Sequence, residues 1–86
     1  MLDVIIQKKA ERDLDALGEP FCSKIIGEIE KLKVRPWSGD IKKLKSRENE
    51  FRLRVGVYRV LFIQEGNTVF IARVLHRKDA YRRESL

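Results

Sequence analysis

The stretch that begins at Phe51 constrains the fold most, because its side chains alternate with a period of two. Its first five residues alternate apolar groups with guanidinium groups: Phe51, Arg52, Leu53, Arg54 and Val55. Successive side chains of a β-strand point to opposite faces of the sheet. The apolar set therefore lies on one face and the two arginines lie on the other.

Two further strands are predicted after this one. Gly56 interrupts the apolar run, which resumes over residues 58–63, and the Glu65-Gly66-Asn67 turn leads into a third strand over residues 69–75. A meander of three adjacent strands gathers side chains suited to a phosphate-rich ligand: Arg52, Arg54, Arg59, His76 and Arg77, with Tyr81 a few residues beyond.

The length of the chain limits what it can enclose. Its 86 residues make a single domain, residues 1–86, and a domain of this size buries roughly 60–65% of its unfolded surface, which leaves no room for a large cofactor. The single cysteine, Cys22, excludes an internal disulfide and fits a structural thiol in a reducing cytosol. No apolar stretch approaches the roughly 18–20 residues of a membrane span, so we expect a cytoplasmic protein.

The positive charge is confined to the second half of the sequence. Residues 1–40 carry seven Lys/Arg and eight Asp/Glu, a net charge of −1, whereas residues 41–86 carry twelve and five, a net charge of +7. Eight of those twelve cations are arginines, whose planar guanidinium groups suit bidentate phosphate contacts. The asymmetry predicts a polyanionic partner, either nucleic acid or an acidic protein segment, rather than a merely solvated surface.

The first half of the chain reads as one strand and two helices. Residues 2–6 are apolar and β-branched, which fits a buried or edge strand. From Lys8 the apolar residues recur at helical spacing up to Gly18, which is a suitable helix stop. Pro20 suits the first turn of a second helix, whose apolar pattern continues to Arg35. The two helices should pack as an antiparallel hairpin.

A turn over residues 36–40 returns the chain toward the sheet. Trp37, within this turn, is interpreted as a cover for the edge of the core, with a partner-binding anchor as the alternative. A short basic strand follows, in which Ile41 and Leu44 stand among Lys42, Lys43 and Lys45. After the meander, residues 78–86 form a charged tail or a short helix.

These elements predict an α+β fold of the order β-α-α-β-β-β-β. The strands after the helices form an antiparallel meander, and the helical hairpin covers the apolar face of the sheet. Arg52 and Arg54 then lie on the uncovered face, and the commitment of that face to positive charge indicates a binding function.

In three segments the sequence resembles the RelE/ParE superfamily of toxins from type II toxin–antitoxin systems. The similar segments are Lys42-Lys43-Leu44-Lys45, the phrase FRLRVGVYRV that begins at Phe51, and RVLHRKDAY, which ends at Tyr81. The resemblance implies a toxin held inactive by an acidic antitoxin in a hetero-oligomer. Its RelE branch, which the His76-Arg77 pair and Tyr81 favour, cleaves messenger RNA in the ribosomal A site, whereas its ParE branch inhibits DNA gyrase.

The resemblance also assigns roles to residues of this chain. It implies catalytic roles for Arg54, Arg59, His76, Arg77 and Tyr81. RNA-binding roles are expected for Lys43, Lys45, Arg52, Arg73 and Lys78. Lysines stand in the best-known RelE pattern where this chain has Arg52 and Arg54, which leaves the identity of the catalytic base open.

The chemistry of metal-independent RNA cleavage needs a base, an acid and cations that stabilise the phosphorane. Arginine stays protonated near neutrality, so we expect it to stabilise the negative charge of the phosphorane rather than to act as a base. His76 is best matched to proton transfer near neutrality, and Glu50, on the Arg52 face by parity, is either a base or an ion-pair partner. Tyr81 either stacks on an unpaired base or packs against the sheet.

The sequence contains no metal-ligand motif and requires no cofactor, because one histidine and one cysteine lie 54 positions apart. Three functions therefore remain: a ribosome-dependent endoribonuclease, a gyrase inhibitor, and a non-catalytic RNA-binding or degenerate toxin.

Overall fold

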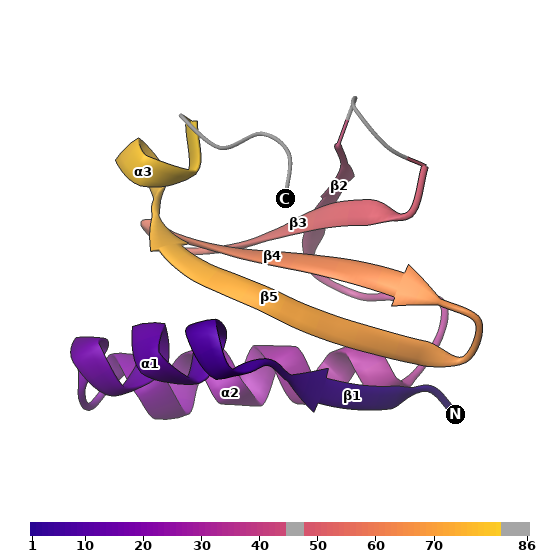
Figure 1. The fold of residues 1–86 in the computed structure, drawn as a ribbon, viewed down its shortest axis with the longest axis horizontal. Coiled ribbons are helices and arrows are strands. Elements are labelled where there is room, and N and C mark those ends of the chain that lie inside the picture. Colours follow the sequence, from indigo (N-terminus) through magenta and orange to yellow (C-terminus); the bar gives the residue numbers. More distant parts are fainter. Residues whose placement is uncertain (45–47, 82–86) are drawn as a thin grey trace.

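The computed structural model describes residues 1–44 and 48–81, and for Tyr81 the backbone alone. The elements follow the predicted order, and of the two alternatives for the tail a short helix begins at Arg77, one residue before the expected start (Figure 1). They are β1 (Asp3–Ile6), α1 (Lys8–Leu17), α2 (Phe21–Glu30), the 3₁₀ turn η1 (Lys31–Lys33), β2 (Asp40–Lys43), β3 (Glu50–Val55), β4 (Tyr58–Glu65), β5 (Thr68–His76) and α3 (Arg77–Tyr81).

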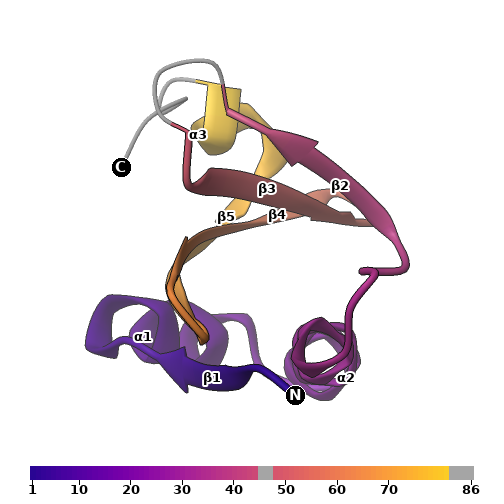
Figure 2. The same cartoon turned by 90° about the vertical axis from the view of Figure 1, so that its right-hand side faces the viewer.

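The sheet has five strands in the order β1-β5-β4-β3-β2. Strands β2 to β5 form the predicted antiparallel meander, and β1 pairs in parallel with β5 at one edge. The helices α1 and α2 lie together on one side of the sheet (Figure 2). The α+β class and the helical hairpin are thereby confirmed.

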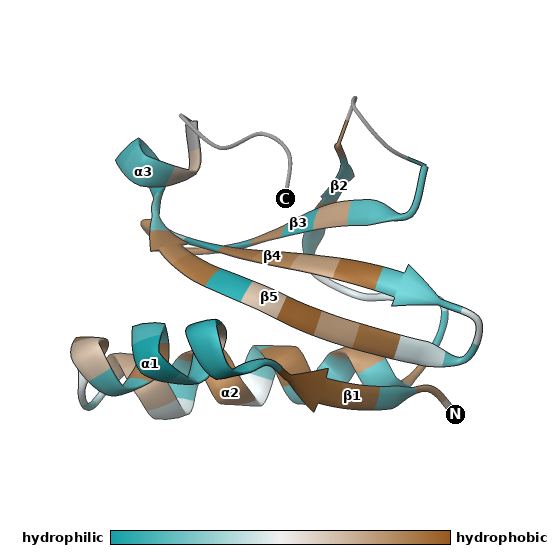
Figure 3. Cartoon of the chain, in the orientation of Figure 1, coloured by the Kyte–Doolittle hydropathy of each residue, from teal (hydrophilic) through white to brown (hydrophobic). Residues whose placement is uncertain are grey.

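The core lies between this hairpin and the sheet, where the period-two pattern of β3 meets the helical pattern of α1 and α2. Leu53 and Val55 are buried in it, as the alternation predicts, together with Ala10 and Leu14 of α1. Figure 3 shows that α1 is mostly hydrophilic along its length, whereas β1 is mostly hydrophobic. Burial of one side of each element holds the layers together.

The helical hairpin differs from expectation at one end. α1 ends where predicted, and Gly18 adopts a positive φ of 69° that glycine tolerates without strain. The prediction that the second helix continues to Arg35 is wrong, because α2 ends at Glu30 and Val34 is already extended. Pro36 disfavours helical backbone at the preceding residue, Arg35. Between α2 and this point, η1 still buries Leu32 in the core.

Trp37 covers the edge of the core, which confirms the interpretation preferred from the sequence. Its indole N–H donates to the carbonyl of Leu32 at 2.9 Å, and its ring makes edge contacts with Phe51 and Phe62 at centroid distances of 5.1 and 5.3 Å. The tryptophan therefore joins the end of η1 to the sheet.

The second face of the sheet is not bare, which corrects the expectation of an uncovered arginine face. α3 lies on the side opposite α1 and α2 (Figure 1) and contacts β4 and β5. Leu61, which the register places beside Arg52, is 1% exposed, and Ala80 of α3 is also buried. A small apolar contact area thus lies next to the basic side chains. No helix in the described part of the chain is long and apolar enough to cross a membrane.

Candidate functional site

Three arginines of adjacent strands converge on the face of the sheet opposite the helical hairpin. The register pairs Arg54 of β3 with Arg59 of β4, and Arg52 lies two residues before Arg54 on the same side of β3. With two residues of β2 they line a polar pocket of about 200 Å³. Its lining residues are Asp40, Lys42, Arg52, Arg54 and Arg59.

The contribution of β2 to this pocket could not be read from the sequence. Asp40 is paired with Arg54 and Lys42 with Arg52, so both point to the arginine side of the sheet. Lys43, the lysine expected to bind RNA, is paired with Phe51 and belongs to the other face. Strand register is what distinguishes Lys42 from its neighbour, because a shift of one residue moves a side chain to the opposite face.

The cations of the pocket repel one another, and Arg59 is also partly buried. The pKa of Arg59 is lowered from its ordinary value, first by burial and then by the positive charges of Arg54, Arg52 and Arg77. Asp40 acts in the opposite direction on Arg59, and its carboxylate lies 3.6 Å from the Arg54 guanidinium. A fold that holds these cations together in spite of repulsion is suited to an anionic ligand.

Arg59 is held in a defined orientation. Its Nη1 donates to the carbonyl oxygens of Gly56 at 2.9 Å and Tyr58 at 3.0 Å. Gly56 has a φ of 59°, which the tight β3–β4 turn requires and which a residue with a side chain rarely adopts. The carbonyl groups at the β3–β4 turn therefore hold the guanidinium of Arg59 in place.

The junction between β5 and α3 places Arg77 near the pocket. The backbone N–H of Arg77 donates to the carbonyl of Val57 in the β3–β4 turn at 2.7 Å. Because the Arg77 charge contributes to the lowered pKa of Arg59, the two guanidinium groups share one electrostatic environment.

His76, one residue earlier, lies on the other side of the sheet. The register pairs it with Tyr58, whose ring lies 6.1 Å from the imidazole and 5.6 Å from the ring of Phe21 in α2. Its Nδ1 accepts a hydrogen bond from the backbone N–H of Lys78 at 3.2 Å. The structure therefore separates His76 from the arginine pocket and places it against the first turn of α3.

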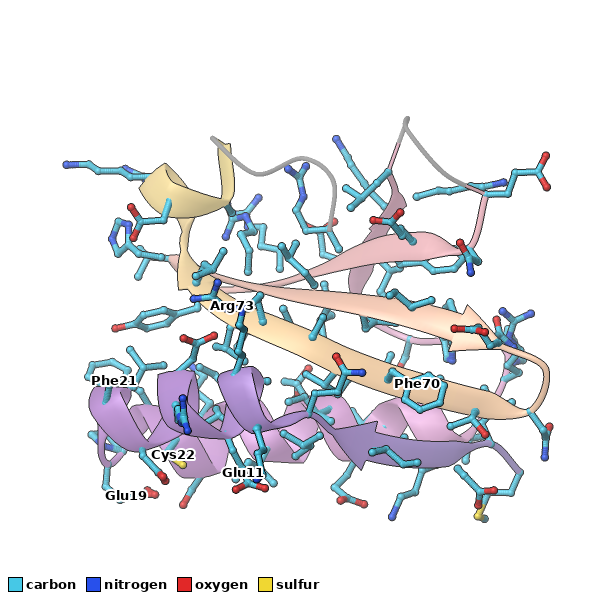
Figure 4. All side chains as sticks on the ribbon, viewed as in Figure 1. Glu11, Glu19, Phe21, Cys22, Phe70 and Arg73 are labelled. Carbon is cyan, nitrogen blue, oxygen red and sulfur yellow. The ribbon has the colours of Figure 1, made fainter. Side chains whose placement is uncertain are left out.

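Arg73 is bound by the helical layer. Its guanidinium donates from Nε and Nη2 to the carboxylate of Asp13 at 2.9 and 3.1 Å, and the N–H of Val74 donates to the same carboxylate at 2.9 Å. Figure 4 shows Arg73 between β5 and α1. The hydrogen bond with Asp13 raises the pKa of Arg73. This pair fastens α1 to the part of β5 that extends past β1, so the structure does not bring Arg73 to the pocket.

The remaining predicted positions divide into described and undescribed groups. Lys78 is exposed on α3, and Glu50 is only 2% exposed, on the arginine side by parity but not among the residues that line the pocket. Lys45 and the side chain of Tyr81 lie outside the described residues, so their expected roles stay predictions.

Similarity to known proteins covers nearly the whole chain. Residues 4–81 match the family described as the ParE toxin of the type II toxin–antitoxin system parDE. Putative toxin RelE1 of Methanocaldococcus jannaschii is 31% identical, over 93% of this chain and 94% of that protein. Toxin RelE3 of the same organism is 50% identical, over 49% of this chain and about half of its own length, 48%.

Solved structures show the same fold. The RelB–RelE antitoxin–toxin complex from Methanococcus jannaschii matches with a TM-score of 0.77 and 32% identity, over 91% of this chain and 95% of that one. The RelBE2 toxin–antitoxin complex from Mycobacterium tuberculosis matches with a TM-score of 0.68 and 25% identity, over 88% and 91%.

Proposed function

The chain belongs to the RelE/ParE superfamily of toxins of type II toxin–antitoxin systems, and from this premise we propose that it cleaves messenger RNA in the ribosomal A site. The proposal places it in the cytoplasm, with the ribosome and its message as targets. An acidic antitoxin would neutralise it in a hetero-oligomer.

The arginine pocket is the observation that carries the proposal. Arg52, Arg54 and Arg59 converge without an equal number of carboxylates in the pocket, and the pKa of Arg59 is lowered by burial and by its cationic neighbours. A phosphodiester in the pocket would relieve that repulsion. Cations fixed in advance around a phosphate stabilise the extra negative charge of a phosphorane more than that of the ground state.

The reaction can be assigned to residues of this chain. The ribose 2′-hydroxyl loses its proton to a base and its oxygen attacks phosphorus. The bond from phosphorus to the 5′-oxygen breaks, the leaving oxygen takes a proton from water, and the base returns its proton to the hydroxide so formed. The products are a 2′,3′-cyclic phosphate and a 5′-hydroxyl. We assign the Arg54 and Arg59 charges to the phosphorane. Asp40, whose carboxylate lines the pocket, is assigned to accept the 2′-hydroxyl proton, a role that geometry gives to a side chain within reach of the reacting group.

The other expected catalytic residues act around this centre in the proposal. Arg77, at the start of α3, adds charge beside Arg59. The hydrogen bond between His76 and the Lys78 N–H favours a positioning role for the histidine, which holds the first turn of α3 and with it Arg77. Tyr81 is proposed to stack on an unpaired base.

A second candidate function is inhibition of DNA gyrase. It is favoured by one observation, that the matching family description names ParE toxins. The same basic face would then bind gyrase or its DNA rather than RNA.

Mapping RNA 5′ ends after induction of the protein in a bacterium tests these alternatives, together with supercoiling by purified gyrase. New 5′ ends at codon positions, with normal supercoiling, are expected. Intact messages with inhibited supercoiling would refute the ribonuclease in favour of the gyrase inhibitor. Tight RNA binding without new ends would leave a non-catalytic RNA-binding protein.

A further inference from the structure

Aromatic rings gather at the end of the sheet where β4 begins and β5 ends. Phe21, the first residue of α2, is 45% exposed, and Figure 4 shows it at the end of the helical layer. Its ring lies 5.6 Å from that of Tyr58, which lies 6.1 Å from the imidazole of His76. Tyr58 and His76 are half-buried. The three rings form one partly exposed cluster, which we call the aromatic patch.

The core does not account for the exposure of Phe21. α2 is fixed to the core by Ile25 and Ile29, which are 1% and 0% exposed. A ring left almost half in water contributes little of the stabilisation that its burial would give. Val57, the residue before Tyr58, is also 44% exposed. Single exposed apolar side chains are common, whereas a group of them is more typical of a binding surface.

Fixed contacts hold the rings of the patch in place. The register pairs His76 with Tyr58, and Nδ1 of His76 accepts the hydrogen bond from the Lys78 N–H. At the start of α2, the Glu19 carboxylate accepts hydrogen bonds from the backbone N–H and the hydroxyl of Ser23 at 3.2 and 2.7 Å. A surface that is formed before its ligand arrives loses little conformational entropy on binding.

The aromatic patch and the arginine pocket meet at the end of the sheet. Tyr58 and Arg59 are consecutive in β4, so their side chains lie on the helical side and on the pocket side of the same strand. Nη1 of Arg59 donates to the carbonyl of Tyr58 at 3.0 Å. Arg77 directly follows His76, and its N–H is bound to the Val57 carbonyl. One layer of backbone thus separates a cationic surface from an aromatic one.

We propose that the aromatic patch binds an unpaired base of the RNA strand whose phosphate occupies the arginine pocket. The base stacks on Phe21 and Tyr58, and the strand passes around the end of the sheet beside Arg77. This inference rests on the proposed function and adds a second base site to the one assigned to Tyr81. Because every base has a π-face, the site should tolerate different bases.

The charges around the patch favour a nucleotide over an apolar protein segment. Arg77 and Lys78 are exposed at the start of α3, and a nucleotide uses both kinds of group, with its base on the rings and its phosphate on the cations. An apolar segment would gain nothing from the cations. Of the acidic residues close in the sequence, Glu19 is already hydrogen-bonded to Ser23 and Asp79 is exposed on α3.

An octanucleotide of 2′-O-methyluridine with a central 2-aminopurine tests the proposal. The 2′-O-methyl groups prevent cleavage, and the fluorescence of 2-aminopurine falls when the base stacks on an aromatic ring. The wild type should therefore quench the probe. The titration is repeated with Tyr81→Ala, so that stacking on Tyr81 is not mistaken for stacking on the patch.

Variants of Phe21 separate stacking from apolar packing. Phe21→Leu keeps an apolar side chain without a ring, and it should weaken binding of the probe about fivefold or more and reduce its quenching. Phe21→Trp restores a ring and should retain both. Ile5→Ala, at a 48% exposed residue of the edge strand β1, is the control and should bind as the wild type does.

Urea unfolding of each Phe21 variant shows that the compared proteins are folded. Equal affinity and quenching by the wild type and Phe21→Leu, in both the wild-type and the Tyr81→Ala background, would overturn the inference. An equal loss in Ile5→Ala would overturn it as well, because the effect would then not belong to the patch.

Two other occupants of the patch give different results. A dimer in sedimentation without RNA, weakened by Phe21→Leu, would show that a second copy of the chain covers the patch and would refute the inference. Protection of a ribosomal RNA base from dimethyl sulfate that Phe21→Leu abolishes, with unchanged quenching of the probe, would assign the patch to the ribosome. That result would refute the assignment to the message.

The RNA cleavage assay distinguishes failure of this inference from failure of the proposed function. A wild type that cleaves message on the ribosome, with quenching that Phe21→Leu leaves intact, would refute the stacking site alone. Quenching that Phe21→Leu abolishes, in a protein that cleaves no message, would support the stacking site and refute the proposed cleavage.

Discussion

Arg54 and Arg59 lie directly opposite each other on β3 and β4, with their side chains on the same face of the sheet. Like charges in such a pair are unfavourable, and among the described residues that line the pocket the Asp40 carboxylate, 3.6 Å from Arg54, offsets them. Under the proposed function, a bound phosphate would relieve this repulsion.

Replacement of Arg59 by alanine should remove catalysis and leave the fold intact. A lost transition-state contact of this kind lowers the rate roughly a hundredfold or more. The free energy of unfolding should change by no more than about 0.5 kcal/mol, because relief of the repulsion between like charges is opposed by loss of the hydrogen bonds from Arg59 to the carbonyls of Gly56 and Tyr58. Cleavage rates and urea unfolding measure both effects. Arg12→Ala, on the exposed face of α1, is the matched control, and full cleavage by Arg59→Ala would exclude the arginine from the mechanism.

The two adjacent lysines of β2 should behave differently toward RNA. Lys42→Ala should reduce the slope of log affinity against log salt concentration by about 0.7, which is the contribution of one phosphate contact on a single strand. Lys43→Ala, with the same change of charge on the opposite face, should leave the slope unchanged. Fluorescence titrations of single-stranded RNA across a salt series measure the slopes. An equal effect of both variants would show a diffuse field rather than a contact.

The Asp40→Asn variant tests whether the Asp40 carboxylate acts as the catalytic base or only affects RNA binding. If Asp40 accepts the 2′-hydroxyl proton, kcat should fall about a hundredfold or more, whereas RNA binding should tighten because a negative charge has left a cationic pocket. Single-turnover kinetics and binding titrations give the two quantities separately. Asp15→Asn on α1 controls for the change of net charge. Tighter binding with an unchanged kcat would assign Asp40 to the control of affinity alone.

His76 should act through the hydrogen bond that its Nδ1 accepts. His76→Asn retains an acceptor near that position and should keep most of the cleavage activity, whereas His76→Ala should lose it as the first turn of α3 loosens. Cleavage rates over pH 5–9 distinguish this from proton transfer. Equal loss in both variants, with loss of a titration near neutrality, would instead establish the proton-transfer role expected from the sequence.

The ion pair between Asp13 and Arg73 should matter for stability and not for RNA. Asp13→Ala leaves the Val74 N–H and the Arg73 guanidinium without this partner, which should reduce the free energy of unfolding by about 1–3 kcal/mol. Urea unfolding measures it, with Glu28→Ala, at an exposed i,i+3 pair with Lys31, expected within about 0.5 kcal/mol of wild type. RNA affinity of the folded variant should be unchanged. Weaker RNA binding by Arg73→Ala at unchanged stability would restore the expected RNA-binding role of Arg73.

Local sequence patterns were enough to predict the order of the elements and the face on which β3 presents its arginines. Alternation over Phe51 to Val55 and helical spacing from Lys8 to Gly18 are local patterns, and burial of one face makes their consequences almost unavoidable. The shared face of Arg52 and Arg54 therefore follows from the sequence alone, and the register of β3 confirms it.

Other features depended on the tertiary structure alone. Whether Lys42 or Lys43 joins the arginines depends on the register of β2 against β3, and Asp40 enters the pocket through the same register. His76 was expected beside Arg77 because the two are consecutive, yet consecutive residues at a strand end point to different sides. Arg73 does not reach the pocket because it is paired with the carboxylate of Asp13, 60 positions earlier in the chain. The sequence shows how residues are spaced within one strand. Which residue of another strand or helix each of them contacts is set by the packing of the whole chain.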